Sequence, residues 1–244
     1  MSSGSSDEES AVATSFGVPE GVRRVFERPD GATRIVLIRH GEAVCNTQGV
    51  VGGVTGCHGL TDLGRRQVAA LAARLAETGE LADVDALYAS VLPRAVETAG
   101  ILQPVLGDGA SAVVEQCDLC ELHPGQADAM SWQEVIDNFG VPEWDSDPGR
   151  VIAPGGESWT GFVERASGAV RALVERHPGQ LLVAAVHAGV IEATMIAFLS
   201  IPPAASRRGW ARIVHASMTE WDWSPTRAQW VLIRFNDACG IPTA

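Results

Sequence analysis

Two histidines in this chain each follow a short run of apolar residues. His40 comes after the run 35–38 and Arg39, and His187 comes directly after the run 181–186. Apolar runs of this length, without polar alternation, are typical of strands that are buried on both faces. Parallel strands end at the same edge of a sheet, and ligands of open α/β folds bind at that edge. We therefore expect the two imidazoles to lie close together at one sheet edge.

Two arginines are placed to bind an anion there. Arg39 directly precedes His40, while Arg94 follows Pro93, a residue that suits the first turn of a helix. A guanidinium can bind two oxygens of one phosphate, and the N–H groups of a helix start can bind the same group. The chain has no lysine, so its 18 Lys/Arg positions are all arginine. This excludes a P-loop lysine and Schiff-base chemistry.

Histidines and arginines in this arrangement, with a nearby carboxylate, predict phosphoryl transfer. A neutral imidazole can attack a phosphoryl group in line and form a phosphohistidine. Arginines stabilise the charge on the transferring oxygens, and an acid protonates the leaving alkoxide. Water then cleaves the phosphohistidine.

The stretch Arg39-His40-Gly41-Glu42, together with Asn46, resembles the signature of the histidine phosphatase superfamily, the family of phosphoglycerate mutases and fructose-2,6-bisphosphatases. The resemblance covers residues 34–237, which is most of the chain. The further matches, in chain order, are Gly59-Leu60-Thr61 with Gly64, Ser90 with Arg94, Leu119-Cys120-Glu121-Leu122, Pro154-Gly155-Gly156-Glu157-Ser158 and Asn236-Asp237.

The resemblance implies a role for each matching residue. His40 matches the nucleophile, and Glu121 matches the carboxylate that acts as proton donor and later as base. Glu115, Asp118 and Asp128 are other carboxylates near Glu121 in sequence. The remaining matches are the phosphate-contacting positions, which are Arg39, Arg94, His187, Asn46 and the backbone of Ala188. The family chemistry needs no metal and no cofactor, so we expect a metal-independent phosphomonoesterase.

The resemblance also implies the fold. We expect a three-layer α/β/α sandwich around a mostly parallel, six-stranded sheet. A small cap subdomain, formed by about 41–59 and 121–157, would cover the site. Residues 1–18 are rich in Ser, Gly and Glu, which predicts a disordered tail, and residues 19–244 would form one domain. Between 41 and 59 the glycine-rich sequence predicts a long site loop, and an apolar helix is expected at 190–199.

Composition limits the partners. A net charge of −12 argues against a nucleic-acid footprint, which needs a basic face. No apolar run has transmembrane length, so no membrane partner is expected. The five cysteines are an odd number in a chain that we expect to be cytoplasmic, so we predict reduced thiols. A small phosphorylated substrate is the expected partner, and no sequence feature defines an oligomer.

Two other functions remain open. A phosphoglycerate mutase would need extra basic residues in the cap to hold the substrate carboxylate, but only Arg150 and His123 lie between Glu121 and Glu157. A protein that binds a phosphorylated ligand without catalysis would lack the nucleophile or its acid, and both are present. The segment after Glu121, His123-Pro124-Gly125-Gln126-Ala127-Asp128, departs from the usual family pattern, so the substrate is not identified.

Other histidines and cysteines have two interpretations. His58, His123 and His215 could contact substrate or lie on the surface. The pair Cys117-x-x-Cys120 could be half of a zinc site or a redox pair, but no second such pair accompanies it. We therefore predict no metal site, and we expect Cys120, beside Glu121, to be a thiol that lines the pocket. Arg207, Arg208 and Arg212 could bind a second anionic group of a substrate or form a solvated basic patch.

Overall fold

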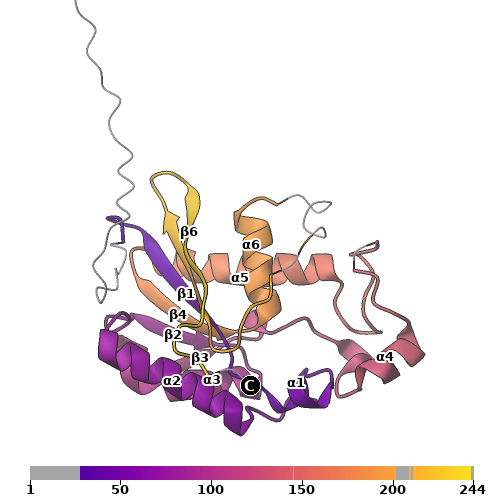
Figure 1. Ribbon diagram of the computed structural model, residues 1–244. Coiled ribbons are helices and arrows are strands. Elements are labelled where there is room, and N and C mark those ends of the chain that lie inside the picture. Colours follow the sequence, from indigo (N-terminus) through magenta and orange to yellow (C-terminus); the bar gives the residue numbers. More distant parts are fainter. Residues whose placement is uncertain (1–27, 145, 202–208, 210, 243–244) are drawn as a thin grey trace, which may run out of the picture.

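A computed structural model describes residues 28–144, 146–201, 209 and 211–242 of the chain (Figure 1). The predicted tail 1–18, and Arg207 and Arg208, lie outside the described residues. Six strands form one sheet in the order β3-β2-β4-β1-β5-β6. The strands are β1 (Thr33–Arg39), β2 (Ala86–Ala89), β3 (Val113–Glu115), β4 (Leu181–Val186), β5 (Met218–Ser224) and β6 (Gln229–Asp237).

The sheet is parallel from β3 to β1 and antiparallel at β5 and β6. Side chains of β1 alternate between its two faces, as expected for a strand inside a sandwich. Val36 and Ile38 pack into one apolar core, and Ile35 and Leu37 pack into the other. All four are fully buried, because helices cover both faces.

The helices form the two outer layers (Figure 1). Helices α2 (Asp62–Thr78) and α3 (Pro93–Leu102) contribute to the first core. Helices α5 (Trp159–Arg176) and α6 (Ala188–Phe198) contribute to the second. The expected three-layer α/β/α sandwich with a mostly parallel sheet is confirmed. Between α3 and α4 (Trp132–Phe139) the chain also forms short 3₁₀ turns at Gln103–Val105, Asp108–Ala110, Cys117–Leu119 and Gly125–Ala127.

The cap subdomain has an apolar core of its own. It carries α1 (Val44–Gln48) and α4 (Trp132–Phe139), which lie together at one side of the molecule (Figure 1). Val51 from the first cap segment packs with Val135 and Ile152 from the second. Backbone pairing between Val50 and Ser131 joins the two segments. The small helix α1 was not expected, because 41–59 was predicted to be loop throughout.

N-cap residues mark where helices α2 and α6 begin. The Thr61 side chain accepts a hydrogen bond from Gly64 N at 2.9 Å, as an N-cap does. Helix α6 begins two residues earlier than predicted, with His187 as its N-cap and Ala188 as its first residue. This places the first turn of α6 directly at the end of β4. None of the helices in the described part of the chain is both long and apolar enough to cross a bilayer.

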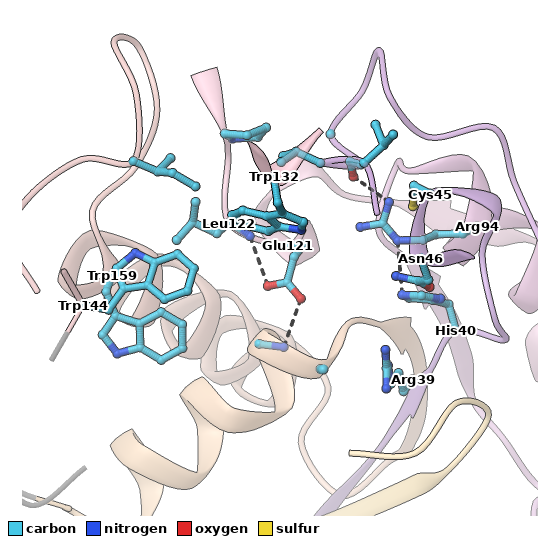
Figure 2. Close-up of a pocket in the computed structure, with 18 residues that line it drawn as sticks. Arg39, His40, Cys45, Asn46, Arg94, Glu121, Leu122, Trp132, Trp144 and Trp159 are labelled. Carbon is cyan, nitrogen blue, oxygen red and sulfur yellow. Dashed lines mark hydrogen bonds between the residues drawn. The ribbon is translucent and has the colours of Figure 1, made fainter. Parts of the chain in front are cut away.

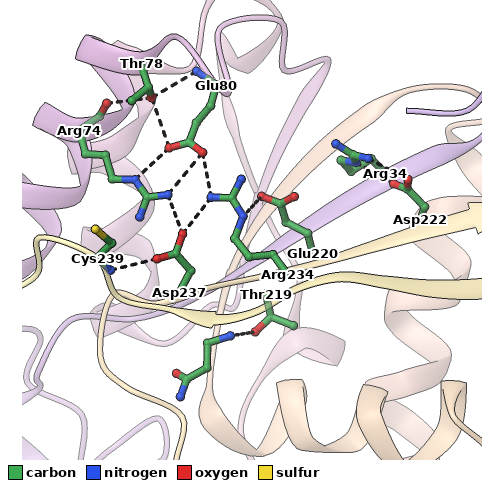
Figure 3. Close-up of polar contacts among 11 residues, drawn as sticks. Arg34, Arg74, Thr78, Glu80, Thr219, Glu220, Asp222, Arg234, Asp237 and Cys239 are labelled. Atoms are coloured by element: carbon green, nitrogen blue, oxygen red, sulfur yellow. Dashed lines mark hydrogen bonds and ion pairs between the residues drawn. The ribbon is translucent and has the colours of Figure 1, made fainter. Parts of the chain in front are cut away.

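Ion pairs hold the antiparallel edge of the sheet in place (Figure 3). Arg74 of α2 and Arg234 of β6 share the carboxylates of Glu80 and Asp237. On the neighbouring strands, Arg34 Nε donates to Asp222 Oδ1 at 2.7 Å, and its NH2 donates to Asp222 Oδ2 at 2.8 Å.

We expect Asp222→Ala to lower the free energy of unfolding by about 3–5 kcal/mol. The side chains of Arg34 and Asp222 are only 7% and 3% exposed, so the variant would leave a buried guanidinium without its bidentate partner. Urea unfolding would measure the change. Asp62→Ala is the control, because its ion pair with Arg65 is exposed to solvent and should contribute little to stability. Equal losses in the two variants would contradict the prediction.

Candidate active site

The two predicted histidines meet at the carboxyl ends of β1 and β4. These strands pair in parallel, with Arg39 opposite Val186, and His40 N donates to Val186 O at 3.0 Å. The ring centroids of His40 and His187 are 5.1 Å apart. Both side chains are buried, because the sheet and the first turns of two helices surround them. The sequence-based expectation of adjacent imidazoles agrees with this geometry.

Arg94 contacts both imidazoles, and Figure 2 shows it beside His40. Its Nε is 3.1 Å from His40 Nε2 and 3.2 Å from His187 Nδ1. Its NH1 donates to Gly52 O at 2.6 Å, which ties the guanidinium to the cap. Arg94 occupies the second position of α3, after Pro93. The proline-led helix start is therefore what positions the arginine at the strand ends.

The hydrogen bonds assign a tautomer to His40. Its Nδ1 is 2.6 Å from Gly41 O, an acceptor, so Nδ1 carries the proton. Its Nε2 faces the Arg94 donor and therefore holds a lone pair. Burial lowers the pKa of His40 well below the ordinary histidine value, and the charge of Arg94 lowers it further. His40 is thus a neutral imidazole with a nucleophilic nitrogen directed at the arginine.

His187 is fixed in the complementary way. Its Nδ1 accepts from Arg94, so its Nε2 carries the proton and donates to Ser90 Oγ at 2.8 Å. Ser90 in turn donates to Cys120 Sγ at 3.4 Å. Burial, followed by the charges of Arg94 and Arg39, lowers the pKa of His187 well below its ordinary value. In this structure His187 is uncharged and orients Arg94, and both of its nitrogens bond within the protein. Ser90 matched a family motif, but sequence reasoning gave it no role.

Arg39 is the second guanidinium of the site. Its NH1 donates to Ile213 O, and its buried Nε has no hydrogen-bond partner among the described residues. Burial lowers the pKa of Arg39 to about 10, with the charges of Arg94 and Arg212 adding to the effect and Glu121 opposing it. Two cations in a partly desolvated site attract an anion strongly. A bound phosphate dianion would supply negative charge to both guanidinium groups.

The three other histidines that were considered for substrate contact differ in their positions. His215 lies beside His40, with ring centroids 5.7 Å apart, and its Nε2 is buried without a partner in the described chain. Burial, with the charges of Arg39 and Arg212, lowers its pKa to about 3. His58 is exposed, and neither His58 nor His123 lines the cavity.

Glu121 lies across the cavity from His40 (Figure 2). Its Oε2 accepts from Gly189 N at 3.0 Å, and its Oε1 accepts from Leu122 N at 3.1 Å. It is the carboxylate among the described residues that line the cavity. Asp128 was another candidate for the proton-donating carboxylate. It instead accepts hydrogen bonds from three backbone N–H groups of the cap loop 53–56.

We expect Gly189→Ala to lower kcat because it displaces Glu121. A Cβ atom at this position would overlap Glu121 Oε1 and lie 3.0 Å from Cε1 of Phe162. A shift of about 1 Å can reduce catalysis by about 10²-fold. Steady-state kinetics would measure the loss. Gly168→Ala on α5, where a Cβ meets no atom, is the control and should leave kcat unchanged. Full activity of Gly189→Ala would show that this contact does not position the carboxylate.

Asn46 and Ala188 both line the cavity, as expected for phosphate contacts. Asn46 Oδ1 accepts from Ala43 N at 3.1 Å, so the Nδ2 group is the end that can donate to a ligand. Ala188 is the first residue of α6. N–H groups in a first helical turn have no acceptor within the helix, so they can bind an anion.

The cavity has a polar end and an apolar end. Its volume is about 310 Å³. The polar end carries the charged residues and His40. The apolar end, on the cap side, carries three tryptophans and several aliphatic residues (Figure 2): Trp132, Trp144, Trp159, Val50, Val51, Leu122, Pro124 and Ile152. Sequence reasoning missed these tryptophans. The available signal was that Trp132 and Trp159 each follow a capping serine.

Comparisons with known proteins agree with this site. A family model described as the histidine phosphatase superfamily (branch 1) matches residues 35–238. The metal-independent phosphoserine phosphatase of Arabidopsis thaliana is 30% identical over 198 residues, which cover 78% of this chain and 79% of that protein. The Arabidopsis thaliana phosphoglycerate mutase-like protein 4 is 32% identical over 160 residues, covering 64% and 67% of the two chains.

Solved structures extend the comparison to the fold. A mycobacterial glucosyl-3-phosphoglycerate phosphatase, in complex with VO3, superposes with a TM-score of 0.67 at 28% identity and covers 83% of this chain and 98% of its own. YhfR of Bacillus stearothermophilus gives a TM-score of 0.70 at 25% identity, with coverage of 84% and 97%. The expected enzyme class is confirmed: this protein is a phosphoric monoester hydrolase, and the chain belongs to branch 1 of the histidine phosphatase superfamily.

Proposed function

We propose that this hydrolase acts through phospho-His40, with Glu121 as its acid and base. His40 Nε2 attacks phosphorus, and the bond to the ester oxygen breaks as Glu121 gives that oxygen a proton. Arg39 and Arg94 bind the phosphoryl oxygens throughout. The Glu121 carboxylate then takes a proton from water, whose oxygen attacks phosphorus as the P–N bond breaks. Inorganic phosphate leaves and neutral His40 is restored. The geometry that supports this assignment is the lone pair of His40 Nε2 at the Arg94 guanidinium.

We further propose that the leaving group is neutral and largely apolar, with an aromatic ring or a similar flat face. The observation that carries this proposal is the lining of the cap end, which is aliphatic and tryptophan-rich. Arg39 and Arg94 are the cationic side chains among the described lining residues, and the phosphate occupies both. A second anionic group would therefore lack a counter-charge and would lie near the Glu121 carboxylate.

The three tryptophans of the cap end pack against one another. The ring of Trp144 lies 6.5 Å from that of Trp132 and 6.2 Å from that of Trp159 between centroids, so the three form one wall.

This proposal differs from the substrates named for the relatives. Phosphoserine and the phosphoglycerate unit of glucosyl-3-phosphoglycerate both carry a carboxylate, and the described cap end offers it no cation. The same argument disfavours a phosphoglycerate mutase, which must hold that carboxylate during two transfers.

We also propose a cytoplasmic location, because Cys45, Cys57, Cys117 and Cys120 are thiols rather than disulfides.

The test compares substrates and a cap variant. We expect kcat/KM for benzyl phosphate to exceed that for phosphoserine and for 3-phosphoglycerate. Trp132→Ala should lower kcat/KM for benzyl phosphate by about 10–100-fold, the equivalent of a buried aromatic contact, and change that for ethyl phosphate little. Trp132 is 42% exposed, so its removal should not unfold the protein.

Phe235→Ala is the matched control, because Phe235 is a 38% exposed aromatic on β6 that does not line the cavity. It should leave kcat/KM unchanged for all four substrates. If phosphoserine or 3-phosphoglycerate is the best substrate, the neutral leaving group is wrong while the phosphohistidine chemistry stands. Conversion of 2- to 3-phosphoglycerate faster than phosphate release would contradict hydrolysis itself.

A further inference from the structure

Three metal-ligating side chains converge just behind Glu121. They are Cys117, Cys120 and His123, and their ligand atoms all lie within 4.8 Å of one another. Cys117 and Cys120 begin and follow one 3₁₀ turn, and Cys120 N donates to Cys117 O at 2.9 Å. None of the three lines the substrate cavity. The prediction that the Cys120 thiol lines the pocket is therefore wrong, because Cys120 packs with Cys57 and Leu92 instead. Sequence spacing predicted no metal here because the second ligand pair of a typical zinc motif is missing.

Two of the three ligand–ligand distances match a tetrahedral site, and the third, between Cys120 and His123, is within 4.8 Å. Tetrahedral Zn²⁺ with Zn–S of about 2.3 Å and Zn–N of about 2.0–2.1 Å implies about 3.8 Å between two sulfurs and about 3.6 Å between sulfur and nitrogen. In this structure the sulfurs of Cys117 and Cys120 are 3.9 Å apart, and Cys117 Sγ is 3.6 Å from His123 Nε2. We propose that Cys117, Cys120 and His123 form a binding site for a thiophilic divalent cation such as Zn²⁺.

The second ring nitrogen of His123 is oriented as in known zinc sites. A ligating histidine commonly donates its other N–H to a carboxylate, which fixes the tautomer and the ring orientation. His123 Nδ1 lies 3.6 Å from Glu157 Oε2, while its Nε2 faces Cys117. His123 N donates to Glu157 Oε2 at 2.9 Å, so the carboxylate fixes the backbone of His123 and lies within ion-pair distance of its ring. This carboxylate is the independent feature that a chance cluster of thiols would lack.

The loop that carries the ligands is held in place by Arg165. Its NH1 donates to Asp118 O at 2.8 Å and to Cys120 O at 3.1 Å, and its NH2 donates to Glu121 O at 3.3 Å. The Arg165 guanidinium is cationic and would by itself repel a bound metal ion. Glu157 accepts from Arg165 Nε and NH2, at 2.7 Å each, and so offsets its repulsion of a cation. These contacts already order the loop, so the loop would lose little conformational freedom when a metal ion binds.

The cation would stabilise the catalytic loop without contacting the phosphoryl group. Glu121 lies between Cys120 and His123 in the chain, so coordination would restrain it from both sides. Cys120 Sγ also accepts the hydrogen bond of Ser90, which contacts His187. A metal-bound thiolate is a stronger acceptor than a thiol and would strengthen this chain of contacts. The solvent-exposed side of Cys117 leaves the fourth coordination position to water.

Cobalt titration of the full-length protein tests the site. The protein is stripped with a chelator, kept reduced with a phosphine, and titrated with Co²⁺ alone. We expect a thiolate-to-cobalt charge-transfer band that saturates at one equivalent and disappears when Zn²⁺ is added. Cys117→Ser should abolish the band. His123→Ala should weaken Co²⁺ binding by more than the roughly 10–100-fold that loss of an outer-shell partner costs.

Cys239→Ser is the matched control, because Cys239 is exposed like Cys117 but lies near Asp237 on the far edge of the sheet. It should bind Co²⁺ as the wild type does. Circular dichroism verifies that each variant is folded. Absence of the band in the wild type would overturn the proposal, as would full retention of binding in either Cys117→Ser or His123→Ala. Because the readout is metal binding, the result does not depend on the assignment of His40.

Discussion

Replacement of His40 by alanine is expected to lower kcat by at least about 10⁴-fold, the scale seen when a covalent nucleophile is removed. Two observations lead to this expectation. His40 Nε2 holds its lone pair at the cavity end of β1, and Arg94 Nε lies 3.1 Å from it. Burial and the neighbouring cations keep the imidazole neutral and therefore nucleophilic. His40 is the one histidine among the described residues that line the cavity, so no other imidazole there could replace it.

Trapping of the phosphoenzyme tests the same residue directly. Brief incubation with a ³²P-labelled substrate, followed by denaturation, should give a label that is acid-labile and stable to base, as expected of a phosphoramidate. His40→Ala should give no label. His58→Ala is the control, because His58 lies on the exposed surface of the same segment, and it should be labelled normally. A labelled His40→Ala protein would assign the nucleophile to another residue.

The polar half of the site could be predicted because short sequence patterns determine it. Each histidine follows an apolar strand, and parallel pairing of β1 with β4 brings both to one edge. Pro93 fixes the start of α3, which places Arg94 in the first turn. Local preferences and one rule of sheet topology are sufficient for these positions.

The apolar half could not be predicted in the same way. Its tryptophans come from segments that join the cap only through tertiary contacts, such as the hydrogen bond from Val51 N to Met130 O. The family resemblance also placed His187 among the phosphate contacts. It did not predict the position of His187 behind Arg94, which depends on Ser90 from another strand end. The same limit applies to His123, whose ring reaches the thiols because Glu157 holds its loop.

Glu121→Gln is expected to lower kcat/KM by about 10²–10⁴-fold for an alkyl phosphate, whose alkoxide needs a proton to leave. The loss in kcat/KM should be much smaller for phenyl phosphate, because phenol has a pKa of about 10 and leaves without full protonation. Glutamine keeps the size of the side chain and an oxygen that can accept from Gly189 N, so the cavity should keep its shape. Measuring kcat/KM over a series of leaving groups would give a steep dependence on leaving-group pKa in the variant, because kcat/KM reports the steps up to release of the leaving group and not the later attack by water.

The dependence on the leaving group separates an acid from a merely structural carboxylate. If Glu121 only held the first turn of α6 through Gly189, the variant would lose the same factor with every substrate. Asp118→Asn is the matched control, because Asp118 is an exposed carboxylate three residues before Glu121 and does not line the cavity. It should behave as the wild type does with both substrates. A steep dependence on leaving group confined to Glu121→Gln would identify this residue as the proton donor, because only a missing proton affects poor leaving groups selectively.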